Sequence, residues 1–382
     1  MQTSLHGALD EIDVSEWDAL DDSGNPFLRH AFLAGAERHG AVSPALGWQP
    51  QHIALRGDDG RLVGALPLYQ RAHSFGDFSG DWHWSAAIER AGYRYFPKLV
   101  SGIPYTPASG PRLLVRPDAE RAAVVGRLID AALERVAVLG ASSWQCLFIE
   151  PDTALKAELE QRGLLLRRGC QFHWRNRGYS DFEDHLADFS AEKRKKVRRE
   201  RRRVADSGLC VEIRHGDEID AALWAQIYPH YRSTFSRFGN HAAFPQSFFE
   251  EIGACLKRDL VVFLARDADC VVAAAICYRS GTRLYGRHWG AEAQYDSLHF
   301  ELCFHQGIEY CIRHGLSAFE PGAQGEHKIS RGFSPTATCS AFWIAEPALR
   351  QSIGAYLQRE QAAVGDYAEQ MTAHAPYRKS LG

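Results

Sequence analysis

Residues 260–289 read LVVFLARDADCVVAAAICYRSGTRLYGRHW. Two apolar runs in this stretch, 260–266 and 270–278, are joined by the turn-like residues Asp267-Ala268-Asp269, and a third run follows at 283–289. Short apolar runs between turn residues are typical of buried β-strands. The stretch therefore predicts three consecutive strands, with a hairpin between the first two.

The residues that follow predict a helix and two further strands. Phe300, Phe304, Ile308 and Cys311 recur at helical spacing within 298–314, and Gly315 is a typical helix stop. Strands are expected at 318–321 and 339–344, with a loop over 322–338 between them. This half of the chain therefore has the composition of an α+β domain.

The first half repeats this order of elements. Residues 62–71 read LVGALPLYQR and resemble CVVAAAICYRSG at 270–281, and a strand at 52–56 precedes them across a glycine-rich turn. A helix is predicted over 119–139, followed by Gly140 and a strand at 144–150. A repeat of about 200 residues predicts two copies of one α+β domain, at 1–168 and 169–382. A chance match between two ordinary hairpins is the alternative.

Composition narrows the class of protein. With 382 residues, 45% hydrophobic and 24% charged, the chain is neither disordered nor collagenous. The N-terminus lacks the features of a secretory signal, and no apolar run is long enough to span a membrane. We therefore expect a cytoplasmic protein without a membrane partner. The nine scattered cysteines predict reduced core residues, not disulfides or a zinc site.

A strongly basic segment interrupts an otherwise acidic chain. Residues 193–203 read KRKKVRRERRR and carry +8, which leaves −11 for the other 371 residues. Ser190 and Gly208 are plausible caps of a helix over 191–207, with Val197 and Val204 as a thin buried seam. A solvated helix paired with acidic residues is one interpretation; a face that binds the phosphates of RNA or another polyphosphate is the other. The candidate phosphate ligands are Lys193, Arg194, Lys195, Lys196, Arg198, Arg199 and Arg202.

A second segment, FEPGAQGEHKISRGF at 319–333, combines glycines with several charged residues. The glycines would let the backbone approach a ligand closely. Lys328 could polarise an acyl carbonyl or stabilise its oxyanion, although a lysine in a surface salt bridge is the plain alternative.

Several kinds of chemistry lack their motifs. His299 and His305 are not on one helical face and no HExxH occurs, so no metal site is expected. GxSxG, GxxxxGK[ST] and GxGxxG are also absent, which argues against a serine hydrolase, an NTPase and a Rossmann-type oxidoreductase.

Taken in order along the chain, eight segments resemble the FemAB-like branch of the GNAT acyltransferase superfamily, a group labelled as peptidoglycan biosynthesis or recognition proteins. These segments are NPFLRHAFL at 25–33, PLYQRAHSFGDF at 67–78, PYTPASGPR at 104–112, QFHWRN at 171–176, the basic segment, LYGRHWG at 284–290, LHFELCFHQGIEYCI at 298–312 and GAQGEHKISRGF at 322–333.

The resemblance implies two tandem GNAT-like domains, each a mixed, mostly antiparallel sheet flanked by helices. It also implies transfer of an amino acid from aminoacyl-tRNA to a peptide amine. Glu320, Gly322 and Lys328 fall at the positions of the loop whose lysine meets the aminoacyl ester carbonyl. Gly110-Pro111 resembles a segment near the acceptor, and the basic helix matches the one that opens the second unit. The helical arm that often accompanies this helix is missing, which leaves other donors open.

Acyl-CoA is the competing donor. The phosphate-binding motif of CoA-dependent GNAT enzymes, Q/R-x-x-G-x-G/A, has its nearest fit at residues 287–292, which read RHWGAE and fail at the last position. This leans toward a donor other than CoA. A non-catalytic RNA-binding protein that uses the basic helix is a further alternative.

We therefore expect an N-acyltransferase that joins an activated donor, aminoacyl-tRNA or acyl-CoA, to a small amine or peptide, with no other cofactor. Lys328 would stabilise the oxyanion, and Glu301, Glu320, Glu326 or His288 would relay the proton. Residues 105–112 and 285–289 are expected to line an acceptor channel between the two units. The substrate-binding candidates are Tyr105, Thr106, Gly110, Arg112, Tyr285, Arg287, Trp289, His299 and Gln324.

Overall fold

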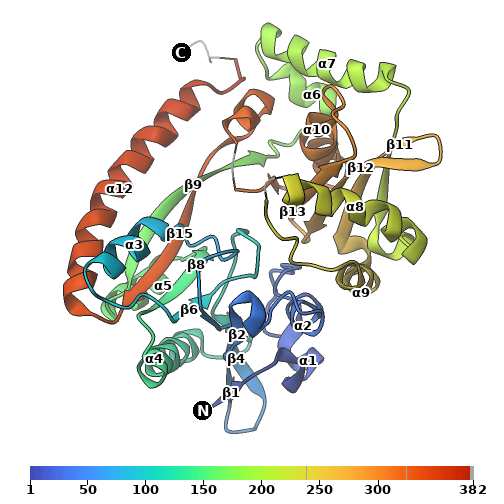
Figure 1. Ribbon diagram of the computed structural model, residues 1–382. Helices are drawn as coiled ribbons and strands as arrows, with labels where there is room; N and C mark the ends of the chain where they lie inside the picture. The colour runs from blue at the N-terminus through green and yellow to red at the C-terminus, as the bar shows by residue number, and fades with distance from the viewer. Residues whose placement is uncertain (238, 324, 379–382) are drawn as a thin grey trace. The chain divides into compact units, whose positions relative to one another are not determined.

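The computed structural model describes residues 1–237, 239–323 and 325–378, and the chain forms two compact units (Figure 1). Unit 1 comprises Met1–Gly169 and Ala337–Asp366, and unit 2 comprises Cys170–Thr336 and Tyr367–Gly382. The first break lies one residue from the predicted boundary, but residues 337–366 belong to unit 1. The sequence repeat indicates where the order of elements starts again. It gives no indication that the chain returns to unit 1 at residues 337–366.

Unit 2 is built on a mixed sheet with the strand order β10-β11-β12-β13-β14-β9. Neighbours from β10 to β13 are antiparallel, whereas β13 and β14 are parallel. The three strands predicted from 260–289 are thus confirmed, each extended by one or two residues. The strands are β9 (Leu165–Arg175), β10 (Cys210–His215), β11 (Leu260–Asp267), β12 (Cys270–Arg279), β13 (Arg283–Ala291) and β14 (Ala318–Glu320).

Helices surround this sheet, and their apolar faces form one core with it. The basic helix α7 packs on the segment after β13 and on the turn after β14 (Figure 1). The helical elements of unit 2 are α6 (Phe182–Ala187), α7 (Ala191–Asp206), η3 (Gly216–Glu218), α8 (Ala221–Arg237), α9 (Gln246–Leu256), η4 (Lys257–Asp259), α10 (Leu298–Phe300), η5 (Glu301–His305), α11 (Gln306–Arg313) and η6 (Glu326–Arg331).

The single helix predicted over 298–314 is interrupted. Between α10 and α11 the segment η5 is one turn of π-helix, Glu301–His305. The spacing of the apolar residues cannot distinguish such a turn from a regular α-helix, because a single turn with i→i+5 hydrogen bonds changes the helical spacing very little. The loop predicted over 322–338 also differs, since it holds η6 and the first residues of β15 (Ser334–Ile344).

Unit 1 contains a small sheet, β1-β3-β4-β7, and strands in the order β15-β8-β6-β5-β2. The apolar run at 62–69 forms two strands because Pro67 lacks a backbone N–H and ends the first. The strands are β1 (Gln2–His6), β2 (Trp48–Pro50), β3 (His52–Arg56), β4 (Leu62–Leu66), β5 (Tyr69–Arg71), β6 (Lys98–Ser101), β7 (Leu114–Val115) and β8 (Ser143–Ile149). The helices are η1 (Leu9–Glu11), α1 (Val14–Asp18), α2 (His30–Arg38), η2 (Pro44–Leu46), α3 (Trp82–Arg90), α4 (Arg121–Leu139), α5 (Thr153–Gln161) and most of α12 (Pro347–Ala373).

Both units contain a parallel strand pair with a helix between the strands. In unit 1, β6 pairs with β8 and α4 connects them; in unit 2, β13 pairs with β14 and α11 precedes the second strand. Gly140 and Gly315, which follow the two helices, both have the left-handed backbone, with φ of 56° and 67°. The predicted order of elements is therefore repeated in the structure.

The nine cysteines differ in their burial. All nine cysteines are free thiols, but Cys210, Cys255 and Cys270 are exposed, so the interpretation of the cysteines as core residues is wrong for these three. They lie near the ends of strands and a helix, where an apolar run in the sequence extends beyond the buried part.

The structure also bears on membrane insertion. Among the described residues, no helix combines the length and the hydrophobicity that a membrane span requires.

Candidate functional site

The parallel strands of unit 2 part after three residues. β14 pairs with β13 only from Arg283 to Tyr285, whereas β13 continues to Ala291 beside β12. Arg287 forms a bulge there, because Ile276 pairs with His288 and the next residue, Cys277, pairs with Gly286. Gly290 lets the backbone of α8 approach β13, since a Cβ atom there would lie 1.7 Å from the carbonyl oxygen of His230. The free portion of β13 therefore starts beside the end of β14.

The turn after β14 buries Lys328. Gly322, Gly325 and Gly332 have φ of 95°, 117° and 96°, which other residues rarely adopt, and they bound the turn that contains η6. The Lys328 side chain is 3% exposed, and its Nζ donates a hydrogen bond to the carbonyl oxygen of Gly322 at 2.7 Å. Within the described residues, no carboxylate forms an ion pair with it. Burial lowers the pKa of Lys328 to about 8, the Cys303 thiol partly opposes this, and Arg287 adds to it.

One buried ion pair ties this turn to the basic helix. Glu200, the single acid of the segment 193–203, is 5% exposed and accepts two hydrogen bonds from Arg331, at 3.1 and 2.6 Å. His305 lies 3.1 Å from the same carboxylate, and Arg331 also donates to the carbonyl oxygen of His327 at 2.7 Å. The guanidinium of Arg331 lies 3.3 Å from the ring centre of Phe300. Glu200 and Arg331 therefore position the backbone that carries Lys328.

Sequence reasoning missed this pair. The available signal was the position of Glu200, three residues after Val197 and four before Val204, which places it on the buried seam of the helix. That seam is confirmed, since Val197 and Val204 are 1% and 3% exposed. Ser190 is at the N-cap position without a capping side-chain bond, and Gly208 follows the C-cap residue, Ser207.

The basic residues of α7 divide into two groups. Arg198 pairs with Glu183, Arg201 with Glu301 and Glu309, and Arg203 with Asp296, while Lys193 lies 3.8 Å from Glu192. The other members of the predicted phosphate-binding set form no ion pair within the described part of the chain, so half of the helix charge is uncompensated. They are Arg194, Lys195, Lys196, Arg199 and Arg202.

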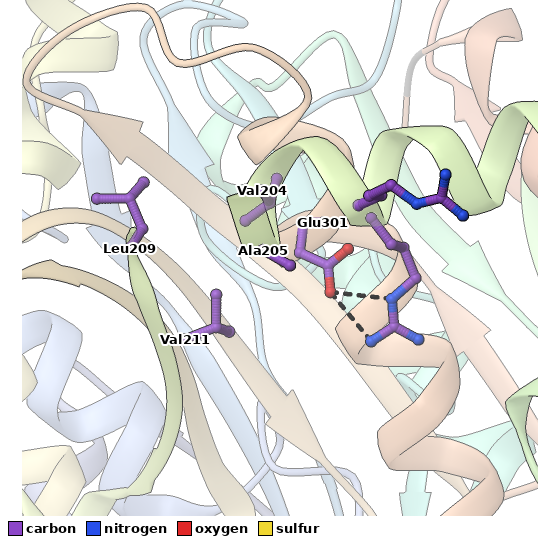
Figure 2. Close-up of a pocket in the computed structure, with 7 residues that line it drawn as sticks. Val204, Ala205, Leu209, Val211 and Glu301 are labelled. Atoms are coloured by element: carbon purple, nitrogen blue, oxygen red, sulfur yellow. Dashed lines mark hydrogen bonds and ion pairs between the residues drawn. The ribbon is translucent and has the colours of Figure 1, made fainter. Parts of the chain in front are cut away.

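Glu301 faces α7. Its Oε1 accepts from Arg201 Nε at 3.2 Å and from Gln306 Nε2 at 2.7 Å, and the residue is 4% exposed. Figure 2 shows the carboxylate beside Val204 and Ala205, at a pocket of about 390 Å³ whose lining also includes Leu209 and Val211. The Glu301 carboxylate is thus occupied by Arg201 and Gln306, and its role as a proton relay stays a prediction.

The other two predicted acids are also engaged. Glu320 is 4% exposed and accepts from Arg283 at 3.0 Å, with His173 Nε2 at 3.9 Å. Burial lowers the pKa of His173 to about 3, and Arg175, Arg283 and Lys328 lower it further, so this imidazole is neutral. Glu326 is exposed and accepts from the Tyr367 hydroxyl at 2.9 Å. Glu320 is thus part of the support beneath the turn.

The histidines near β13 differ in their surroundings. His288 lies among aromatic rings, with Tyr231 and Phe249 at 4.8 and 6.0 Å, and burial holds its pKa well below the usual value. The His299 ring lies 5.3 Å from Trp289 and 6.0 Å from His327.

Burial lowers the pKa of His299 to about 4, and His327, Arg331 and Lys328 contribute to this shift. His327 is more exposed, and burial with the charges of Lys328 and Arg331 lowers its pKa as well. His327 was not among the residues predicted from the sequence. Its only signal was its position directly before Lys328. Gly325 makes room for its ring, since a Cβ atom at 325 would lie 2.4 Å from the imidazole.

Two more predicted residues of β13 are largely internal. Tyr285 is 3% exposed and stands opposite Glu320 in the parallel pair. Burial lowers the pKa of Arg287 to about 10. Gln324 lies outside the described residues.

The predicted acceptor segment of unit 1 is held by hydrogen bonds to backbone carbonyls, two of them outside the segment. The Tyr105 hydroxyl donates to Ala41 at 3.0 Å, and the N–H of Gly110 donates to Phe148 at 3.1 Å. Thr106 and Arg112 are 3% and 1% exposed, and Arg112 Nη2 donates to the Ala108 carbonyl at 2.7 Å. The segment is a rigid support, and substrate binding by these four residues remains a prediction.

Comparison with known proteins covers most of the chain. Residues 8–379 match the FemAB-like family, described as peptidoglycan biosynthesis/recognition. No curated protein matches the sequence.

Similar solved structures include FemX, at 14% identity and a TM-score of 0.55, covering 93% of this chain and 100% of that one. They also include the C-terminal domain of a lysylphosphatidylglycerol synthetase from Agrobacterium fabrum, at 12% identity, 92% and 96% coverage and a TM-score of 0.55. A tandem GNAT protein from the clavulanic acid biosynthesis pathway has 15% identity, 91% and 99% coverage and a TM-score of 0.47. The predicted α+β fold of two tandem GNAT-like domains is confirmed, and the chain belongs to the FemAB-like family.

Proposed function

We propose that the protein is an acyltransferase of peptidoglycan-related biosynthesis that joins an activated acyl group to an amine. The family assignment supports this class of reaction. The observation that carries the proposal is the environment of Lys328, a 3% exposed lysine whose Nζ donates a hydrogen bond to a backbone carbonyl. A buried ammonium without a carboxylate partner is best stabilised when negative charge develops beside it, as on the oxygen of a tetrahedral intermediate.

The reaction requires little from the protein beyond positioning and charge. The neutral acceptor amine attacks the carbonyl carbon of the donor ester, and the carbonyl oxygen becomes an oxyanion that Lys328 stabilises. The ester C–O bond then breaks as the amide C–N bond is retained. The proton lost by the amine nitrogen passes to the departing alkoxide, so that no net proton is released.

We assign the transfer of this proton to His327. Glu301 and Glu320 are held by arginines, and His288 is enclosed by aromatic rings. His299 has a pKa of about 4, which makes it a weak base at neutral pH. His327 is exposed and directly precedes Lys328, and burial with the charges of Lys328 and Arg331 lowers its pKa, which keeps the imidazole neutral and able to accept a proton at neutral pH.

For the donor, we favour aminoacyl-tRNA. The five basic residues of α7 without ion-pair partners among the described residues offer contacts to a phosphate backbone. The turn between β13 and α10, where a CoA pyrophosphate would be bound in the competing reaction, carries Glu292 and Asp296. Carboxylates at this position disfavour a pyrophosphate.

A transfer assay with purified protein tests the reaction. A mixture of tRNAs charged with radiolabelled amino acids is incubated with a peptide amine, and in parallel with acetyl-CoA in place of the charged tRNA. We expect label in the amide product from the charged tRNA, and loss of this product in Lys328→Ala. Lys156→Ala, at an exposed lysine of unit 1, is the matched control. If the protein consumes a CoA thioester saturably and forms no product from aminoacyl-tRNA, the proposed donor is wrong. If Lys328→Ala is fully active, the proposed role of Lys328 is wrong.

Binding to tRNA provides a separate test of the basic helix. In K195A/R199A/R202A we expect weaker binding. The slope of log K against log salt concentration should also become less negative, by the amount that corresponds to the loss of about two to three phosphate contacts. The control is R198A/R203A, because both of these arginines are already paired with acids. If the control variant loses more affinity than the first, the assignment of the contact face is wrong.

A further inference from the structure

The exposed aromatic residues of the protein are concentrated in one stretch of unit 1. Among the described residues, the large aromatic side chains with high exposure are Phe75, Phe78, Trp82 and Tyr93, at 43%, 45%, 55% and 42%. We call these four residues the aromatic face. They lie in the irregular region 73–112, which the proposed reaction does not explain.

Chain geometry keeps the aromatic face within a small area. Seven residues separate Phe75 from Trp82, which limits their separation to about 25 Å. Trp82 begins α3, and Tyr93 follows its end, where the N–H of Tyr93 folds back to the carbonyl oxygen of Ile88 at 3.1 Å. Trp84 lies on the packed side of α3, with ring centres 5.2 Å from Phe342 and 5.9 Å from Tyr356. Trp82, two residues earlier and 55% exposed, therefore belongs to the outer side of this helix.

The loop that carries Phe75 and Phe78 is firmly held from below. Lys98, fully buried, lies 2.9 Å from Asp77 and 2.5 Å from Asp81. Arg71 donates to the carbonyl oxygen of Phe75 at 2.6 Å. Phe78 has a φ of 58°, an unfavourable backbone conformation for a phenylalanine. A buried ion cluster thus fixes a loop whose apolar side chains are exposed to water. Such an arrangement is expected of a contact surface.

The charges around the aromatic face indicate the kind of partner. Both aspartates of the loop are buried beside Lys98, so the exposed charged residues of 73–95 are Glu89, Arg90 and Arg94. The exposed charges of this stretch, two arginines and one glutamate, therefore sum to +1 on a chain of net charge −3. Aromatic rings with flanking arginines suit the boundary between lipid headgroups and acyl chains, where the rings are buried and the arginines meet anionic headgroups.

We propose that the aromatic face binds the surface of a bilayer that contains anionic phospholipid. The association is peripheral, through Phe75, Phe78, Trp82 and Tyr93, with Arg90 and Arg94 at the headgroups. It goes beyond the expectation that the protein has no membrane partner, which rested on the lack of a membrane-spanning run, and it does not depend on the proposed reaction.

Co-sedimentation of the full-length protein with vesicles tests this proposal. We expect binding to vesicles of phosphatidylcholine and phosphatidylglycerol at 3:1, and weaker binding to phosphatidylcholine alone. F75S/F78N/W82S should reduce the partition coefficient by at least about tenfold. Asn is chosen at 78 because it tolerates a positive φ. L5S/V14S/V138S is the matched control, since it removes three exposed apolar side chains of unit 1 elsewhere, at 49%, 53% and 72% exposure.

A second measurement guards against a variant that misfolds. Brominated phospholipids should quench tryptophan fluorescence of the wild-type protein, and W82F should lose most of this quenching while it keeps the vesicle binding. Absence of wild-type binding to the mixed vesicles would overturn the proposal. Equal losses in the aromatic and control variants with unchanged thermal unfolding would also overturn it. So would retention of full binding in F75S/F78N/W82S, which would show that another surface of the protein binds the bilayer.

Discussion

Each unit buries a lysine in the neighbourhood of its parallel strand pair, and the two lysines have different partners. Lys98 begins β6 in unit 1 and lies 2.9 Å from Asp77 and 2.5 Å from Asp81, with Ser74 and Ser79 as further acceptors. Lys328 follows β14 in unit 2, and within the described residues no carboxylate pairs with it. Both side chains are almost inaccessible to water, at 0% and 3%.

The difference between them lies in where the compensating charge comes from. Although burial alone would raise the pKa of Asp81, Lys98 holds it below its usual value, so the charge of Asp81 is compensated within the fold. Burial instead lowers the pKa of Lys328 to about 8, and in the described part of the chain the groups that oppose this are the carbonyl oxygen of Gly322 and the Cys303 thiol, with no carboxylate. A buried lysine with its own carboxylates supports the structure, whereas one without them is ready for a negative charge from a ligand.

The largest effect is expected from removing Lys98. In Lys98→Met, Asp81 stays buried without its cation and Asp77 keeps only Arg71, whose Nε lies 3.9 Å away, which should lower the free energy of unfolding by about 3–5 kcal/mol. Urea denaturation followed by circular dichroism measures this loss. K98M/D81N, which removes one charge of each sign and leaves Asp77 with Arg71, should recover part of it. If Lys98→Met is as stable as the wild type, the cluster is not the support that its geometry indicates.

Lys328→Met should have the opposite balance. We expect the rate of transfer to fall by about 10²–10³, the cost of removing one oxyanion donor, while the free energy of unfolding at pH 7 stays equal or rises. The comparison of kcat with urea midpoints for this variant and Lys98→Met separates the two roles. A Lys328→Met protein that unfolds as easily as Lys98→Met would show that both lysines are structural.

The sequence predicts the role of Lys328, but it does not predict the cluster around Lys98. Lys328 stands out because glycines surround it in a segment with a family likeness, and the strands that position it follow from apolar runs. Lys98 and its aspartates lie 17 and 21 residues apart in an irregular segment, where no periodicity indicates which charges meet. Glu200 is similarly hidden, because a single acid within a basic run gives no sign that it pairs with Arg331, 131 residues away.

Giving Lys328 a counter-ion should turn it into a lysine of the Lys98 type. Cys303 is close enough to influence the pKa of Lys328, and Cys303→Asp would place a carboxylate there. We expect a fall in kcat of about tenfold, because the ammonium is then partly neutralised before the oxyanion forms. The high-pH limit of activity should also move upward.

Cys303→Asn is the control, since it has nearly the same shape without the charge. Equal losses in the Asp and Asn variants would show that packing, not charge, explains the effect.

The smallest effect concerns stability against pH. The pKa of Lys328 falls from 10.5 to about 8 on folding, so between these values the unfolded chain binds more protons than the folded one. Stability therefore rises with pH in this window, by about 1 kcal/mol from pH 7 to pH 9 for this residue. Urea midpoints of the wild type and Lys328→Met at both pH values isolate the contribution, because other groups titrate alike in the two proteins. The gap between them should narrow as pH rises, and a gap that widens would mean that Lys328 has a carboxylate partner after all.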